Sequence, residues 1–298
     1  MKILVLAGPT AAGKTAAAMR VADLWPGVRL VSADAMQVYR GMDIGTGKPT
    51  PAELARYPHA CVDIRDSDAP YSAADFAADA DAIIAEGAPT VIVGGTGFYL
   101  RALLVGLAPA PSADEALRAE LEALDDPHAA LARVDPVLAA QLHPNDRVRV
   151  IRGLEVHRLT GRPFSAIHQE HAFTAPRHPA VRRWLDRDDL DARIDARVLK
   201  MVEDGYVEEV RRLLTSGVDR DSKPMRSLGY RWMGAHLLDD LPLAEAVRLT
   251  QRDTRRFARK QRGMLRSIGG FEQIDAEDWP AVRAAATEAF GPPQDEET

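Results

Sequence analysis

A glycine-rich segment near the N-terminus constrains the fold of this 298-residue chain more than any other feature. Residues 8–15, GPTAAGKT, match the pattern G-x-x-x-x-G-K-[ST] in full, between an apolar run and a helical pattern. In that context the loop turns backbone N–H groups toward one anion, and the helix N-terminus adds partial positive charge. Lys14 supplies a formal charge, and the Thr15 hydroxyl can hold Mg²⁺. A glycine-rich turn without a ligand is the less favoured alternative.

The segments around this loop predict strands that alternate with helices. Apolar runs typical of buried strands cover residues 2–7, 28–32 and 90–93. Helical patterns cover 14–24 and 72–86, and Ser72 with Asp75 three residues later resembles a capping box at the start of the second. Alternation of this kind produces a parallel sheet with helices on its faces. We therefore predict an α/β fold, a P-loop-type parallel sheet flanked by helices.

A change of pattern near residue 108 predicts a second region. Helical patterns without strands follow at 114–124, 129–141 and 146–159. The His-rich stretch 161–179 contains Gly and Pro and is expected to be a polar loop. We predict a helical insert at 112–180 within a catalytic core formed by 1–111 and 181–298. Beyond the insert, helices are expected at 189–214, 229–238 and 243–266, and the polar tail from 292 is expected to be disordered.

The composition excludes several classes of protein. Apolar residues make up 46% of the chain and charged residues 28%, as in a globular domain with a sizeable core. No apolar run approaches the ~20 residues that cross a bilayer, and the first residues lack a signal-peptide pattern. Cys61 is the only cysteine, which excludes a disulfide framework and a cysteine-based zinc site. We expect a cytoplasmic monomer without membrane contact.

The charge is distributed unevenly. The net charge is −6, but residues 245–266 hold eight basic and two acidic residues, a local charge of +6 that leaves −12 on the rest. Six arginines there follow one another at intervals of three or four, on one stripe of a helix: Arg248, Arg252, Arg255, Arg259, Arg262 and Arg266. Like charges at this spacing repel one another. The stripe therefore faces an RNA phosphate backbone, acidic residues elsewhere in the chain, or solvent.

Asp34 is a candidate for proton transfer because it directly follows the second apolar run. The carboxyl ends of parallel strands line the ligand crevice of such a sheet, so Asp34 is expected close to the phosphate loop. There it can accept a proton from a nucleophile, cap a helix or act as an outer ligand of Mg²⁺, and its position alone does not separate these roles. Residues 45–49, GTGKP, form either another phosphate loop or, the favoured interpretation, a surface turn.

Two further patterns bear on the type of reaction. The apolar run 90–93 ends in GGTG, without the acid that helps most P-loop NTPases to hold Mg²⁺. This disfavours a motor or switch NTPase and leaves a small-molecule kinase open. Residues 168–171, HQEH, approach a metal-ligand pattern, but without nearby cysteines a solvated loop is the favoured interpretation.

Longer motifs cover nearly the whole chain. They are GPTAAGKT at 8–15, SADAMQVYRGMDIGTGKP at 32–49, DIRD at 63–66, YSAADF at 71–76, GGTGFYLRALL at 94–104, HPNDRVRVIRGLEV at 143–156, TGRP at 160–163, SLGYRWM at 227–233 and TRRFARKQ at 254–261. In kind and order they resemble the tRNA dimethylallyltransferase (tRNA isopentenyltransferase) family. The second motif is far more discriminating than the phosphate loop.

The resemblance implies a reaction. A dimethylallyl group passes from dimethylallyl diphosphate to the exocyclic N6 amine of the adenosine immediately 3′ of the anticodon. Asp34 matches the general base, Thr96 a hydroxyl near the leaving-group oxygen and Arg226 a diphosphate-binding arginine. The diphosphate cradle matches Gly8, Pro9, Thr10, Ala11, Ala12, Gly13, Lys14 and Thr15, with Mg²⁺ on Thr15.

The resemblance also implies a partner, the anticodon stem-loop of tRNA, gripped by the insert. The implied tRNA contacts are Asp34, Ala35, Met36, Gln37, Arg118, Gln169, Arg252, Thr254, Arg255 and Arg259. Enzymes that prenylate free adenine nucleotides share the phosphate loop and the aspartate, but have less need of an insert and an arginine stripe. A nucleoside or small-molecule kinase and a non-catalytic RNA-binding module are the alternatives from other classes.

Overall fold

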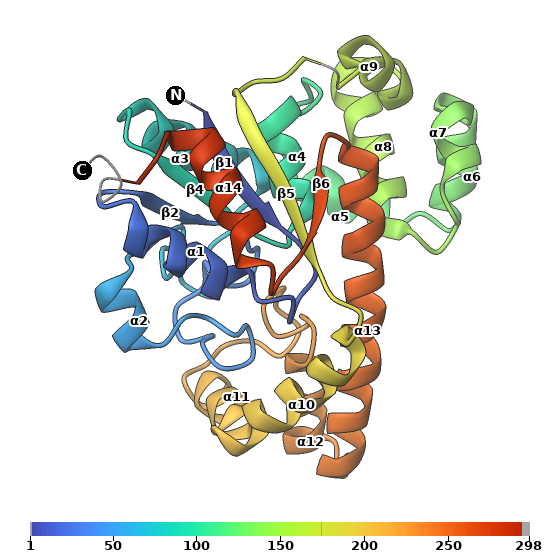
Figure 1. Ribbon diagram of the computed structural model, residues 1–298. Coiled ribbons are helices and arrows are strands. Elements are labelled where there is room, and N and C mark those ends of the chain that lie inside the picture. The colour runs from blue at the N-terminus through green and yellow to red at the C-terminus, as the bar shows by residue number, and fades with distance from the viewer. Residues whose placement is uncertain (1, 174, 294–298) are drawn as a thin grey trace. The chain divides into compact units, whose positions relative to one another are not determined.

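A parallel sheet lies at the centre of the fold. The computed structural model describes residues 2–173 and 175–293, and within them six strands form one sheet with only parallel pairings (Figure 1). Their spatial order is β3 (His59–Ala60), β2 (Arg29–Ser32), β4 (Thr90–Gly94), β1 (Ile3–Ala7), β5 (Ala180–Asp186) and β6 (Glu272–Asp275). The predicted α/β fold is confirmed.

Strand β5 follows the insert directly, in a segment for which no strand was predicted. It pairs with β1 in register from Ile3 opposite Ala180 to Ala7 opposite Trp184. Its sequence, AVRRWLD, lacks an apolar run because two arginines stand at its centre. Arg183 is largely buried, and its guanidinium pairs with the carboxylates of Glu272 and Glu288. Ion pairing therefore allows a charged residue to remain in an inner strand, which a search for apolar runs cannot detect.

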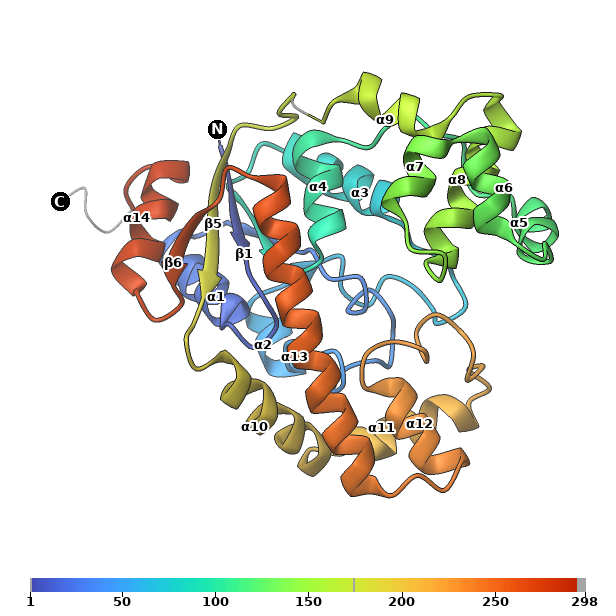
Figure 2. The ribbon, with the colours of Figure 1, turned by 90° about the vertical axis from the view of Figure 1, so that its right-hand side faces the viewer.

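Helices cover both faces of the sheet. Figures 1 and 2 show α1 and α14 on one face and α3 and α4 on the other. The helices of this part are α1 (Lys14–Leu24), α2 (Pro51–Arg56), α3 (Ala73–Ala85), α4 (Gly97–Val105), α10 (Leu190–Glu203), α11 (Tyr206–Thr215), α12 (Tyr230–Leu238), α13 (Leu243–Ile268) and α14 (Trp279–Phe290). The expected capping box of α3, Ser72 with Asp75, is present. One helix was expected over 189–214, but Gly205, at φ 101°, separates α10 from α11.

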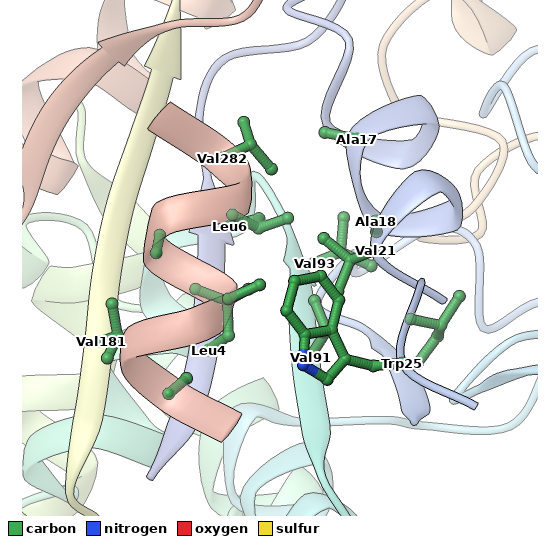
Figure 3. Packing of buried hydrophobic residues seen from close by; sticks show 14 of the residues in the cluster. Leu4, Leu6, Ala17, Ala18, Val21, Trp25, Val91, Val93, Val181 and Val282 are labelled. Atoms are coloured by element: carbon green, nitrogen blue, oxygen red, sulfur yellow. The ribbon is translucent and has the colours of Figure 1, made fainter. Parts of the chain in front are cut away.

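Apolar side chains from the sheet and from α1 and α14 form a buried core on one face (Figure 3). Leu4 and Leu6 of β1, Val91 and Val93 of β4, and Val181 of β5 alternate along their strands, so they share this face. Val21 and Trp25 pack on them from α1, and Val282 packs on them from α14. This core fixes the end of β1 from which the glycine-rich loop leaves.

The chain divides into two compact units, Met1–Leu104 with His178–Thr298, and Val105–Arg177. The second unit is helical, with α5 (Glu115–Glu122), α6 (Pro127–Val134), α7 (Pro136–Gln141), α8 (Arg147–Thr160) and α9 (Phe164–His171). Asp135 caps α7, so the helix expected over 129–141 is two helices. The expectation of a loop at 161–179 was also wrong, because α9 lies there.

No helix among the described residues has the length and apolar character needed to cross a bilayer. Of the tail expected to be disordered, residues 294–298 lie outside the described part of the chain.

Candidate active site

The glycine-rich loop connects β1 to α1 and wraps around its own lysine. Gly8, at φ 151°, is required by packing, since a Cβ there would lie 2.3 Å from the carbonyl oxygen of Leu185 in β5. Gly13 takes a left-handed conformation and begins α1. The Lys14 ammonium donates to the carbonyl oxygen of Pro9 at 2.7 Å. The pKa of Lys14 is lowered to about 8, mainly by burial and also by nearby Arg197, while Asp34 partly opposes the shift.

Asp34 stands at the carboxyl end of β2. The backbone N–H of Ala33 donates to Val93 and the N–H of Thr96 donates to Ala33, which joins the ends of β2 and β4. Oδ1 of Asp34 accepts from the N–H groups of Met36 at 2.9 Å and Gln37 at 3.4 Å. These hydrogen bonds stabilise a turn at residues 35–38 and not a helix, so the helix-capping alternative left open by the sequence is replaced by the capping of a turn. This capping occupies one carboxylate oxygen, and no hydrogen bond within the described residues reaches Oδ2.

Thr96 lies beside the Asp34 segment. Its Oγ1 accepts the N–H of Ala35 at 3.0 Å, which leaves the hydroxyl hydrogen available to a ligand oxygen. The loops that carry Asp34, Thr96 and Lys14 follow β2, β4 and β1, which are neighbours in that order in the sheet. The structure thus brings these three predicted residues to one edge of the sheet.

The loop at residues 45–49 does not present its backbone to a phosphate. The N–H groups of Asp43, Ile44 and Gly45 all donate to the carboxylate of Glu209, at 2.7 to 3.1 Å. Glu209 is buried and also accepts from the Tyr230 hydroxyl at 2.6 Å. An internal carboxylate therefore occupies the anion position of this turn, as the favoured interpretation of the sequence requires.

Gln261 of α13 ties two site loops together. Its Oε1 accepts the N–H of Thr10 at 2.9 Å, and its Nε2 donates to the carbonyl oxygen of Gly95 at 2.9 Å. The side chain is buried, and a Cβ on Gly95 would lie 2.2 Å from Nε2. Gln261 therefore sets the spacing between the phosphate loop and the loop of Thr96. The sequence contains it only as the last residue of a motif.

Basic residues of α10 were missed by the sequence reasoning. Arg193, Arg197 and Lys200 line a cavity of about 370 Å³ together with Ala11 and Gly13 of the phosphate loop. Arg193 also donates through Nε to the carbonyl oxygen of Ala11 at 3.2 Å. The three residues are spaced by four and three, which places them on one face of a helix. That spacing is visible in the sequence and is the signal that would have found them.

Arg226 is not brought to this site by any contact of the described residues. Its side chain is 70% exposed, and its guanidinium lies 3.7 Å from the carboxylate of Asp221. The role implied by the family resemblance stays a prediction for this residue.

The arginine stripe of α13 faces acidic side chains, which is one of the alternatives left open by its spacing. Arg255 pairs with Asp195, Arg262 with Asp186 at 2.6 Å, and Arg259 approaches Asp191 at 4.0 Å. Arg248 and Arg252 pair with acids of their own helix, Glu245 and Asp253. The Thr254 hydroxyl donates to the carbonyl oxygen of Thr250 at 2.7 Å. Contact of these residues with RNA stays a prediction.

Two other predicted RNA contacts belong to the helical unit. Arg118 forms two hydrogen bonds to the buried carboxylate of Glu155, at 2.9 and 3.0 Å. Gln169 is exposed on α9. His168 and His171 lie on this helix rather than in a loop, and the described residues contain no group of three or more metal-binding side chains.

Comparisons with known proteins identify the family of this chain. A family model described as IPP transferase matches residues 37–267, and one described as isopentenyl transferase matches residues 1–67. The tRNA dimethylallyltransferase of Geobacter sulfurreducens is 43% identical over 97% of both chains. The tRNA dimethylallyltransferase 1 of Citrifermentans bemidjiense is 48% identical over 88% of both chains.

Solved structures give the same result. The tRNA isopentenylpyrophosphate transferase of Bacillus halodurans superposes with a TM-score of 0.68 at 34% identity, over 97% of both chains. A eukaryotic dimethylallyltransferase acting on tRNA superposes with a TM-score of 0.80 at 25% identity, over 96% of this chain and 77% of the other. This chain belongs to the tRNA dimethylallyltransferase family of prenyl-transferring enzymes.

Proposed function

We propose that the protein transfers a dimethylallyl group from dimethylallyl diphosphate to the N6 amine of the adenosine immediately 3′ of the anticodon in tRNA. One observation carries the proposal: a carboxylate, a hydroxyl and a phosphate cradle follow three neighbouring parallel strands, β2, β4 and β1. The names of the relatives, tRNA dimethylallyltransferases, supply the class of donor and acceptor.

The phosphate loop holds the diphosphate of the donor. Adenine's amine is a poor nucleophile because its lone pair is delocalised into the ring, so the allylic carbon must become strongly electrophilic. As the C–O bond breaks, its electron pair leaves with the diphosphate oxygen. Lys14 and the N–H groups at the start of α1 stabilise the charge that develops there, and the Thr96 hydroxyl donates to the departing oxygen.

Asp34 acts as the base. As the amine lone pair forms the new C–N bond, the N6 proton passes to Oδ2, while Oδ1 remains held by the N–H groups of Met36 and Gln37. Those two hydrogen bonds fix the orientation of the carboxylate before the substrate arrives. A base positioned in this way contributes about 10²–10⁴-fold to the rate.

The donor groups of the site fit Mg²⁺ shared with the substrate. The Thr15 hydroxyl, in the first turn of α1, would be the side-chain ligand that holds the ion. The ion supplies charge to the leaving diphosphate when bound.

The tRNA is proposed to contact the Asp34–Gln37 segment, the helical unit through Arg118 and Gln169, and α13 through Arg252, Thr254, Arg255 and Arg259. The target adenosine leaves the anticodon stack to reach a carboxylate at the end of a strand.

Transfer of labelled dimethylallyl from its diphosphate, with Mg²⁺, tests the proposal. Unmodified tRNA and AMP are offered as acceptors in parallel, with a characterised tRNA dimethylallyltransferase as positive control. Label in tRNA alone is the expected result. Label in AMP would replace the acceptor while keeping the chemistry, and label in neither would contradict the proposal and direct attention to ATP-dependent kinase activity.

A further inference from the structure

Arg197 of α10 is an arginine without an acidic partner. No hydrogen bond or ion pair among the described residues joins its guanidinium to a carboxylate. Its one hydrogen bond runs from Nη2 to the carbonyl oxygen of Gly47, at 3.4 Å. By contrast, Lys200, one turn further along α10, pairs with Asp204, and the arginines of the α13 stripe from Arg248 to Arg262 each face an acid.

Other cations surround this guanidinium. Burial lowers the pKa of Arg197, Arg193 adds to the shift, and Asp34 opposes it. Arg197 in turn lowers the pKa of Lys14 in the phosphate loop. Cations that are drawn together without an acid in contact raise the energy of the free protein, and an anion bound among them removes that cost.

The chain reserves space for the Arg197 side chain. Gly47 has φ +61°, and a Cβ at this position would lie 1.6 Å from Nη2 of Arg197. Arg197 also lines two cavities, the basic one of about 370 Å³ beside Ala11 and Gly13, and a smaller one of about 50 Å³ beside Thr10. The Arg197 side chain therefore borders cavities that the phosphate loop also lines, so a ligand of that loop is within its reach.

We propose that Arg197 is a catalytic diphosphate ligand, which binds the leaving group together with Lys14. This rests on the proposed function and adds a residue from α10 to the cradle. The planar guanidinium donates two parallel hydrogen bonds to phosphate oxygens, while Lys14 acts as a point charge. Arg197 binds the diphosphate of the donor and stabilises the same group after the C–O bond breaks. The unpaired state of Arg197 in the free protein is the reason that the site attracts a diphosphate.

The test measures binding of inorganic diphosphate, with Mg²⁺, by titration calorimetry, and KM for each substrate in the transfer assay. Arg197→Met is expected to weaken diphosphate binding and to raise KM for dimethylallyl diphosphate by at least about tenfold, with KM for tRNA unchanged. Arg197→Lys should recover only part of the loss, because an ammonium lacks the fork of donors. Arg211→Ala, an exposed arginine of α11 paired with Glu208, is the matched control and should behave as the wild type.

A thermal melt separates this role from a structural one. Since removal of the unpaired cation relieves repulsion at Lys14, the melting temperature of Arg197→Met without diphosphate should equal or exceed that of the wild type. Diphosphate binding by Arg197→Met within twofold of the wild type would overturn the proposal. A changed kcat–pH profile with intact diphosphate binding would also overturn it, because Arg197 would then act through the ionisation of Asp34. If Arg197→Met does not fold, Arg197→Gln is measured against the same criteria.

Failure of the proposed function is distinguishable. A wild type that binds diphosphate but transfers no prenyl group to tRNA contradicts that function and leaves the binding test of Arg197 valid. If the wild-type protein binds no diphosphate, the proposed function and the proposed role of Arg197 are both overturned.

Discussion

At the scale of single residues, the site combines a carboxylate with buried cations around one phosphate loop. Asp34 partly opposes the lowering of the pKa values of Lys14 and Arg197, so the three groups act on one another through their charges. The proposed base and the proposed anion cradle therefore lie close together, and no ion pair between them is present among the described residues.

Asp34→Asn should lower turnover by about 10²–10⁴-fold and leave diphosphate and tRNA affinity nearly unchanged. The amide keeps an oxygen that accepts from Met36 and Gln37, so the loop is retained while the proton acceptor is lost. Single-turnover transfer and separate binding titrations check this. Asp68→Asn, which changes an exposed aspartate, is the control. Equal turnover of Asp34→Asn and the wild type would remove Asp34 from the mechanism.

Diphosphate affinity should fall as the pH rises through about 8, the lowered pKa of Lys14 in the free protein. Below that pH the ammonium is charged and attracts the anion; above it the neutral amine does not. Titrations of the wild type and of Lys14→Arg at pH 7 and 9 measure the change. Both proteins share the ionisation of diphosphate itself, so only the wild type should show the additional loss. Identical pH profiles would contradict the assignment.

Asp34 was predicted at this edge because it follows an apolar strand and parallel strands end together. Lys14 was identified by the glycine-rich motif, and Thr96 by the family resemblance. Gln261 and Arg197 were not found because each comes from a helix more than 100 residues further along the chain, and its role depends on the tertiary structure.

At the scale of elements, α13 connects parts of the core. It runs from the region of α10 and α12 past the sheet (Figure 2). Its arginines face acids on α10 and at the end of β5, while Gln261 reaches the loops after β1 and β4. These acidic side chains offset the repulsion that the arginines of the stripe would otherwise exert on one another.

Gln261→Leu should destabilise the protein by about 1–3 kcal/mol, because the N–H of Thr10 and the carbonyl of Gly95 lose their buried partner. KM for dimethylallyl diphosphate should rise as the phosphate loop loosens. Denaturant unfolding and steady-state kinetics measure the two effects. Lys260→Ala, an exposed neighbour, controls for the loss of a side chain from α13. If Gln261→Leu were as stable as the wild type, the two hydrogen bonds of Gln261 would contribute nothing to the free energy of unfolding.

Arg255→Ala combined with Arg259→Ala tests whether RNA replaces the acidic partners of the stripe. If it does, tRNA affinity falls and the slope of log K against log salt decreases by about 1–2. The charge-matched control is Arg211→Ala with Arg212→Ala on α11. An unchanged salt slope would assign both stripe residues to internal ion pairs alone.

Strands with an apolar sequence were predicted, whereas strands with charged or exposed residues were not. The strands β1, β2 and β4 each contain a run of buried apolar residues and were found. Strand β5 has two arginines in place of apolar residues, and β6, EQID, is short and largely exposed, so neither shows a strand pattern.

At the scale of the whole molecule, the two units have separate cores. The helical unit packs around Leu131, Leu138 and Ile151, and beside this cluster Glu155 is fully buried. Burial opposes ionisation of Glu155, but hydrogen bonds from Arg118, Arg152 and the N–H of Asp114 hold its pKa below the usual value. The carboxylate thus contributes stability at neutral pH that is lost as acid protonates it.

Glu155→Gln should therefore destabilise the helical unit by about 3 kcal/mol, since two arginines lose their buried anion. Diphosphate binding, a property of the other unit, should persist. Denaturation is monitored by amide exchange within 105–177 and, separately, by diphosphate binding. In the variant the two probes should give different unfolding midpoints. Glu120→Gln, which removes an exposed pair with Arg158, is the control. Loss of diphosphate binding together with the helical unit would mean that the two unfold as one.

The position of β5 has a consequence for how such a chain can vary. The helical unit leaves the sheet after β4 and returns as β5, and these strands flank β1 on its two sides. The two strands that bracket the unit in the chain are therefore both paired with β1, and none of the six strands found among the described residues lies within the unit. A gain or loss of helices in this one interval would therefore alter no strand of the sheet and none of the loops that carry Asp34, Thr96 and Lys14.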